Sequence, residues 1–178
     1  HYAEQLRFHV AEEILLGFDE MHQRECFHLD GKSDNIVVNH KGKIQLIDFG
    51  LSQFGTKGKV KGNNMGADPR PWLSPECYLA YYGMVDPSLD GAAIDAWSAG
   101  LILLELIYPG EIPFHEKKIE QIVCGPKPES GMRGEQLQHY FEGEIAKIPD
   151  LASPPFHSYL EVVAGLLTFD PAKRLSIG

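Results

Sequence analysis

Apolar residues recur at helical spacing near the start of the chain. Between residues 3 and 22, Leu6, Val10, Ile14 and Phe18 fall on one stripe, and no proline interrupts the segment. Such a stripe predicts an amphipathic helix with one buried face. This helix would lead directly into the polar residues around position 30.

A β-hairpin is predicted just after those polar residues. Two apolar runs, 36–38 and 43–47, flank residues 39–42, whose sequence is Asn-His-Lys-Gly. Short apolar runs on both sides of a glycine-containing turn are typical of paired antiparallel strands. Pairing would carry Asn35, before the first strand, and Asp48, after the second, to the same edge.

The remaining pattern is mostly helical. Residues 94–107 are apolar nearly all round, which predicts a helix buried on every side. Residues 159–167 alternate at helical spacing, and one or two short helices are expected between 109 and 156. Residues 50–71 hold five glycines and two prolines, which predicts a long loop. We therefore expect one mainly α domain, a helical bundle around a buried central helix, with a short β-hairpin that carries the active edge.

Charge and cysteine usage narrow the classes of function. The net charge is −9, and phosphate backbones bind to clustered Lys and Arg, so no nucleic-acid partner is expected. Cys26, Cys77 and Cys124 lack the spacing of a zinc site or a disulfide framework, which predicts a reduced, intracellular and cytoplasmic protein. The apolar stretch 94–108 is shorter than the roughly 20 residues of a membrane span, so no membrane span is expected. No charged-then-apolar leader follows His1, so no signal peptide is expected.

The candidate chemistry lies on both sides of the hairpin. Before it stands His28-Leu29-Asp30-Gly31-Lys32-Ser33-Asp34-Asn35, and after it stands Asp48-Phe49-Gly50. Amide and carboxylate oxygens are ligands that Mg²⁺ prefers, and Asn35 and Asp48 supply them. A carboxylate that can accept a hydroxyl proton, Asp30, and a lysine two residues later, Lys32, suit a migrating phosphoryl group. The sequence predicts a phosphotransferase site with Asn35 and Asp48 as metal ligands.

These residues resemble the catalytic loop and the metal-binding motif of eukaryotic-type protein kinases. Four further segments match the family in the right order: Ser74-Pro75-Glu76, Asp95-Ala96-Trp97-Ser98-Ala99-Gly100, the loop 108–114, and Asp170-Pro171-Ala172-Lys173-Arg174-Leu175. Five ordered matches over nearly the whole chain are far more specific than any one of them. Residues 1–178 resemble the C-terminal, large lobe of a protein kinase domain.

The resemblance implies ATP-dependent phosphoryl transfer to a hydroxyl of a protein substrate, with ATP and Mg²⁺ as cofactors. Asp30 would act as the catalytic base or position the hydroxyl, and Lys32 would place its ammonium near the transferred phosphate. Lys32, Asn35 and Asp48 would bind the nucleotide through its phosphates and its metal ion. A lysine at position 32 resembles the serine/threonine-directed members.

The resemblance also implies architectural roles for six residues: His28, Phe49, Gly50, Glu76, Asp95 and Arg174. The imidazole of His28 would be buried against Phe49 and would bond the backbone around it. Asp95 would accept hydrogen bonds from amides of the catalytic loop. Glu76 and Arg174 would form a buried ion pair.

The other seven histidines share no ligand spacing. They are predicted to lie on the surface or on helix faces: His1, His9, His22, His40, His115, His139 and His157.

Three features depart from the family pattern. Leu29 stands where an arginine commonly precedes the catalytic Asp, so a phosphate on the activation loop would lack its usual partner. The loop 66–73 has no threonine, and Trp72 resembles tyrosine-directed relatives, which leaves the hydroxyl specificity open. Nothing before residue 28 resembles a glycine-rich phosphate loop, a strand lysine or its glutamate partner. The sequence thus predicts that the N-terminal lobe is missing and that the chain alone is weakly active.

Two other interpretations remain open. A small-molecule phosphotransferase of the aminoglycoside or choline kinase type shares the catalytic loop and a following acidic motif, but Ser74-Pro75-Glu76 and Arg174 weigh against it. A non-catalytic scaffold, or pseudokinase, would keep the fold to bind partners. The four polar residues retained around the hairpin argue against that interpretation, and the missing lobe argues for it.

Overall fold

Helices dominate the computed structural model, which describes residues 2–62, 72–110, 112–124, 132–148 and 156–178. The helices are α1 (Tyr2–His22), α2 (Pro75–Tyr81), α3 (Gly91–Ile107), α4 (Glu116–Cys124), α5 (Met132–Ile145) and α6 (His157–Leu166). The strands are β1 (Cys26–Phe27), β2 (Ile36–Val38), β3 (Ile44–Leu46), β4 (Gln53–Phe54), β5 (Lys59–Lys61) and β6 (Ser88–Asp90). The mainly α class predicted from the sequence is confirmed.

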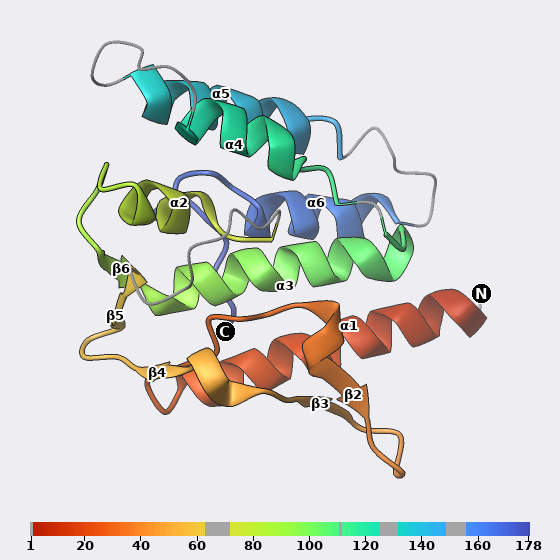
Figure 1. The fold of residues 1–178 in the computed structure, drawn as a ribbon. Coiled ribbons are helices and arrows are strands. Elements are labelled where there is room, and N and C mark those ends of the chain that lie inside the picture. Colours follow the sequence, from red (N-terminus) through yellow and green to blue (C-terminus); the bar gives the residue numbers. More distant parts are fainter. Residues whose placement is uncertain (1, 63–71, 111, 125–131, 149–155) are drawn as a thin grey trace.

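Helix α3 forms the centre of the fold, as its apolar pattern predicts. The Asp90 side chain caps its first turn by accepting a hydrogen bond from the Ala93 amide at 3.1 Å. Nearly every residue of α3 is buried, with α1 packed on one side and α6 on the other (Figure 1). Among the described residues, no helix is both long enough and apolar enough to cross a membrane.

Helix α1 lies along α3 through the stripe that the sequence predicts, although the stripe is buried unevenly. Ile14 and Phe18 are almost fully buried, whereas Leu6 near the start of the helix is exposed. The C-terminal half of α1 is therefore the more deeply buried, and it is followed by strand β1 and then by the loop that carries Asp30. Helix α1 also contacts strand β3, so it supports the hairpin (Figure 1).

The predicted hairpin is present as β2 and β3, which pair antiparallel with Ile36 opposite Leu46 and Val38 opposite Ile44. In its turn, the Asn39 side chain accepts hydrogen bonds from the amides of Lys41 and Lys43. Gly42 adopts a φ of 79°, which L-residues with side chains rarely adopt. The turn chemistry thus fixes the register of the two strands.

The long loop predicted at 50–71 is wrong for its first half. Strand β4 pairs with β1, and β5 pairs with β6, with Val60 opposite Leu89. Val60 is buried among residues from other elements, so these short strands form through partners distant in sequence, not through a local apolar run. Residues 63–71 lie outside the described part of the chain. Helix α2, which no sequence pattern indicated, follows at Pro75.

Helices α4 and α5, the short helices predicted between 109 and 156, form an outer layer over α2 and α6 (Figure 1). An aromatic cluster joins this layer to the central helix. Trp97 of α3 stacks on Phe114 with ring centroids 5.2 Å apart, and Phe114 packs on Phe141 of α5 at 4.6 Å. Such contacts are worth about 0.5–1.5 kcal/mol each beyond the area that they bury.

A buried ion pair joins α2 to the C-terminal segment. Arg174 donates to both carboxylate oxygens of Glu76, from Nη1 at 2.7 Å and from Nη2 at 2.9 Å. The guanidinium also donates to three backbone carbonyls and lies 5.1 Å from the centroid of the Trp97 ring; the carbonyls belong to Ala93, Thr168 and Phe169. Because the pair is almost fully buried and every bond is charge-assisted, we expect its removal to be costly.

The Glu76→Gln variant should lose about 3–5 kcal/mol of unfolding free energy, because it leaves the guanidinium of Arg174 buried without a carboxylate. Urea denaturation followed by circular dichroism measures this loss. As a control, Lys173→Met removes an exposed pair with Asp170 and should cost less than about 1 kcal/mol. A Glu76→Gln midpoint equal to that of the wild type would contradict the expectation.

Candidate active site

The loop that follows β1 is fastened to the central helix by one carboxylate. Asp95, in the second turn of α3, is fully buried. Its Oδ2 accepts the amide of His28 and its Oδ1 accepts the amide of Leu29, both at 2.8 Å. The hydrogen bonds expected between Asp95 and the loop amides are therefore present, and they fix the backbone just before Asp30.

His28 connects the loop to the strand that precedes Asp48. Its ring is fully buried, and its Nε2 lies 3.0 Å from the carbonyl oxygen of Ile47. A carbonyl only accepts, so Nε2 carries the proton, and Nδ1 is left to accept the amide of Asp30 at 3.4 Å. One neutral imidazole thus links the backbone at Asp30 to the residue before Asp48.

Asp30, Lys32 and Asn35 form a compact polar group at the mouth of the loop. The Oδ2 of Asp30 accepts from Lys32 Nζ at 2.8 Å and from Asn35 Nδ2 at 3.2 Å. The same Asn35 nitrogen donates to the Asp30 carbonyl at 2.8 Å. Asn35 is buried, whereas the side chain of Asp30 is 13% exposed. The amide thus holds a carboxylate that a reactant can still reach.

Asp48 lies at the same end of the hairpin as Asn35. The amide of Ile47 donates to the carbonyl of Asn35 at 2.9 Å, so the next residue, Asp48, emerges beside that end. Its φ of 61° is left-handed, a region that aspartate tolerates better than most residues. The Gly50 amide donates to Oδ1 at 3.3 Å and closes a local turn, which helps to hold this conformation.

Phe49 packs against His28, with ring centroids 5.4 Å apart. The imidazole is buried as expected, but the phenylalanine is 54% exposed and covers only one side of it. The exposed part of Phe49 borders a depression of about 410 Å³ beside the hairpin, which Leu46 and Phe54 also line. Phe49 and Phe54 thus leave apolar surface exposed at this edge, in a depression that Glu20 and Arg24 also line.

The amide oxygen of Asn35 and the carboxylate of Asp48 are of the chemical type that a magnesium ion prefers. The Asn35 amide nitrogen makes both of its hydrogen bonds, and its oxygen has no recorded partner among the described residues. One oxygen of Asp48 is likewise unoccupied by any recorded bond there. Mg²⁺ commonly takes only one or two protein ligands and fills its shell with water and phosphate oxygens. No cluster of three or more His, Cys, Asp or Glu side chains occurs within the described ranges.

A small cavity beside Asp30 is lined by the residues around the start of α2, including Trp72, Ser74 and Cys77. Burial, reinforced by the neighbouring Glu76 carboxylate, raises the pKa of the Cys77 thiol. The thiol also accepts a hydrogen bond from Ser74 Oγ at 3.1 Å. A protonated, buried thiol is a poor nucleophile, and Cys77 is one of the residues of a buried apolar cluster, so its place here is explained by packing.

Leu29 is strained and buried. Its φ of 65° is unusual for a leucine, and such backbone conformations cost of the order of 1–3 kcal/mol. The side chain belongs to an apolar cluster that joins the loop to β5, α2, β6 and α3: Phe27, Leu29, Val60, Cys77, Ala80, Leu89 and Ile94. The residue that replaces the family's arginine thus packs inside the domain, beside Val60 from the segment that follows Gly50.

His22 is a residue that the sequence reasoning missed. Of the two predicted places, surface or helix face, the second holds, since His22 is the last residue of α1. That face points inward, because Nε2 lies 2.9 Å from Asp95 Oδ2 and the side chain is only 9% exposed. The sequence offered one signal for this role, namely the position of His22 at the end of the predicted first helix, six residues before His28. Only the long-range contact with α3 reveals its partner.

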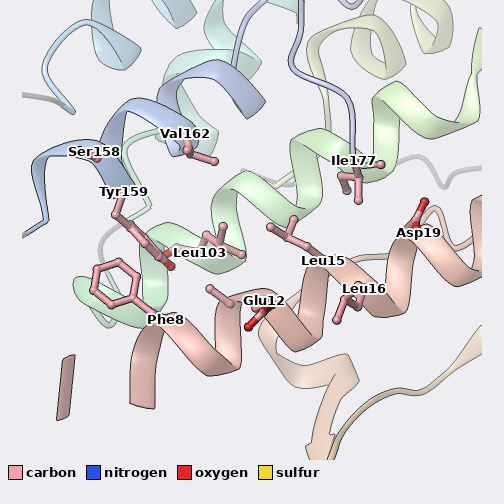
Figure 2. Close-up of a pocket in the computed structure, with 12 residues that line it drawn as sticks. Phe8, Glu12, Leu15, Leu16, Asp19, Leu103, Ser158, Tyr159, Val162 and Ile177 are labelled. Atoms are coloured by element: carbon pink, nitrogen blue, oxygen red, sulfur yellow. The ribbon is translucent and has the colours of Figure 1, made fainter. Parts of the chain in front are cut away.

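A second depression, an open groove of about 470 Å³, lies away from these residues between α1, α3 and α6 (Figure 2). Phe8, Leu15, Leu103 and Val162 give it an apolar lining. The groove lacks the combination of carboxylate, amide and lysine found beside the hairpin. The candidate active site is therefore the smaller polar site, not the larger groove.

Comparison with known proteins identifies the family to which the chain belongs. A model of the protein kinase domain family matches residues 1–178, and the chain belongs to that family. It is 30% identical over 170 residues to the probable serine/threonine-protein kinase mkcD of Dictyostelium discoideum, covering 94% of this chain and 22% of the relative. It is also 30% identical over 178 residues to cyclin-dependent kinase 7 of Caenorhabditis elegans, covering 94% of this chain and 52% of the relative.

A third relative is the mitogen-activated protein kinase SLT2/MPK1 of Saccharomyces cerevisiae, 30% identical over 182 residues. That match covers 93% of this chain and 36% of the relative. The chain thus spans between about a fifth and about half of the length of these three proteins. The resemblance to protein kinases drawn from the sequence motifs is confirmed at the level of the family.

The Leu29→Ala variant should lose about 2–5 kcal/mol of unfolding free energy, because it leaves a cavity in the cluster around Val60. Thermal or urea denaturation measures the loss. Leu16→Ala, which truncates a half-exposed leucine of α1, should cost less than about 1 kcal/mol and serves as the control. Equal losses in the two variants would show that the packing of Leu29 contributes nothing specific.

Proposed function

We propose that this chain is the large lobe of a protein kinase that transfers the γ-phosphoryl group of ATP to a serine or threonine hydroxyl of a protein. The observation that carries the proposal is the bridging imidazole of His28, which ties the backbone at Asp30 to the residue before Asp48. Phosphoryl transfer depends mainly on positioning and electrostatics, and this arrangement supports both.

Each polar residue has a distinct task in the proposed reaction. Asp30 orients the substrate hydroxyl and accepts its proton, and the two donors on its Oδ2 hold the carboxylate in place. Lys32 supplies positive charge beside that carboxylate, where the transferred phosphate would lie. Asn35 and Asp48 would hold Mg²⁺, which when bound neutralises charge on the phosphate oxygens.

The serine/threonine preference rests on Lys32 and on the relative mkcD, whose name describes it as a probable serine/threonine-protein kinase. Trp72 resembles tyrosine-directed members, so the preference needs a direct comparison. Matched peptides that differ only in Ser, Thr or Tyr at the acceptor position would measure it. Cys26, Cys77 and Cys124, all within the described part of the chain, form no disulfide, which supports placing the protein in the reducing interior of the cell.

We further propose that a second lobe completes the nucleotide site above the hairpin. The support is the apolar edge formed by Phe49 and Phe54, which line the same depression and are 54% and 81% exposed. Contiguous exposed apolar side chains commonly mark a surface that another body covers. The adenine and the outer phosphates of ATP would bind between that body and the edge.

The isolated 178-residue chain should therefore bind ATP weakly and transfer phosphate poorly. Radiolabelled ATP and a generic protein substrate provide the assay, with the complete protein as the positive control. Fast turnover by the 178 residues alone would rule out the need for a second lobe.

In the complete protein, Asp30→Asn should lower kcat by about 10²–10⁴-fold, because an amide cannot accept the hydroxyl proton. Asp34→Asn makes the same chemical change at an exposed carboxylate of the same loop and should stay close to the wild-type rate. Unchanged turnover in Asp30→Asn would disprove the mechanism. A wild-type protein with no transfer at all would instead favour the non-catalytic scaffold.

A further inference from the structure

His22 and the Asp95 carboxylate meet below the catalytic loop, and this contact has no role in the chemistry described so far. Three donors converge on Asp95: the amides of His28 and Leu29, and Nε2 of His22 at 2.9 Å. Of these three donors, His22 is a side chain and the other two are backbone amides. Two of the three donors, His28 and His22, share the single oxygen Oδ2.

The donor nitrogen of His22 follows from its partner. An ionised carboxylate can only accept, so Nε2 donates the hydrogen bond, and Nδ1 takes no part in it. That Nδ1 is buried and has no hydrogen-bond partner within the described part of the chain. Leaving a buried polar atom unsatisfied is unfavourable. The buried Nδ1 of His22 therefore carries an energetic cost that a phenyl ring, which has no polar atom, would avoid.

The surroundings of His22 would suit a phenyl ring equally well. Its ring lies 5.3 Å from that of Phe27 and 6.3 Å from that of Phe18, both buried. Packing alone therefore gives no reason for a polar ring in this place. What the imidazole adds to the packing is its hydrogen bond to Asp95.

We infer that His22 is a positioning residue for the proposed phosphoryl transfer, acting through Asp95 on the loop that carries Asp30. By bonding Oδ2, His22 fixes the rotation of the carboxylate plane, and that plane sets where the amides of His28 and Leu29 lie. The same loop backbone then places the imidazole of His28 and the carboxylate of Asp30. The inference rests on the proposed function for its effect on rate, but its effect on the loop does not.

Two variants separate the hydrogen bond from the packing. His22→Phe keeps a ring between Phe18 and Phe27 and removes the donor. His22→Gln keeps an N–H donor at a similar reach and removes the ring. Ile14→Ala, at a buried position of the same helix two turns earlier, provides a control that destabilises the domain without touching Asp95.

Amide hydrogen exchange of the 178-residue chain tests the effect on the loop directly. The exchange rates of the His28 and Leu29 amides are divided by those of Leu103 and Leu104 within α3, which removes any global loss of stability. In His22→Phe this ratio should rise by about tenfold or more, as expected for loss of a local hydrogen bond. It should rise much less in His22→Gln and stay at the wild-type value in Ile14→Ala.

Kinetics of the complete protein test the consequence for transfer. His22→Phe should lower kcat by roughly tenfold or more through misplacement of Asp30, with the KM values for ATP and peptide nearly unchanged. His22→Gln should recover most of the rate. A merely structural residue would instead lower activity in proportion to thermal stability, as Ile14→Ala does.

An unchanged exchange ratio in His22→Phe would overturn the inference, and so would equal losses of kcat in the Phe and Gln variants. If the complete wild-type protein transfers no phosphate, the proposed function fails. The exchange ratio then still decides whether His22 positions the loop.

Discussion

Helix α3 is apolar on every side, and this constraint organises the whole domain. A helix without a polar face has to be covered all round, and α1, α6, α2 and the aromatic cluster of Phe114 and Phe141 supply that cover. The polar exceptions near its start, Asp95 and Ser98, are themselves buried. Asp95 satisfies its carboxylate with the backbone of the catalytic loop. The loop thus has a fixed position because the helix beneath it is fixed.

In the proposed function, the site divides into a buried part that would position the reacting groups and an accessible part that would react. His28, Asn35 and Asp95 are buried, and each bonds the backbone of another segment. Asp30 and Asp48 keep oxygen atoms nearer to solvent, where a nucleotide and an acceptor hydroxyl could reach them. Rigid support beneath exposed reactive groups is the arrangement that preorganised catalysis requires.

Much of this organisation could be predicted from the sequence, because it depends on local signals. The stripe of α1, the turn at Asn39 and the all-round apolar pattern of α3 each specify an element without knowledge of its neighbours. The strands β4 and β5 gave no such signal, since their partners Cys26 and Leu89 lie far away in sequence. His22 escaped for the same reason: the residue that gives it a role belongs to α3, more than seventy positions later. The proposed roles of four residues came from motif spacing: Asp30, Lys32, Asn35 and Asp48. Motif spacing indicates which chemistry a residue could do, but it does not give the distances and contacts between side chains.

The backbone at Gly31 lies so close to α3 that a β-carbon there would come within 2.5 Å of the Ser98 β-carbon and 3.2 Å of the Phe18 ring. This glycine is required by lack of space, not by its backbone angles. Any side chain would act as a wedge between the loop and the helix, and would lift Asp30 and Lys32 together. Tolerance to substitution should therefore change abruptly within three residues. Position 31 should accept no other side chain, whereas the solvent-facing Ser33 and Asp34 should accept many.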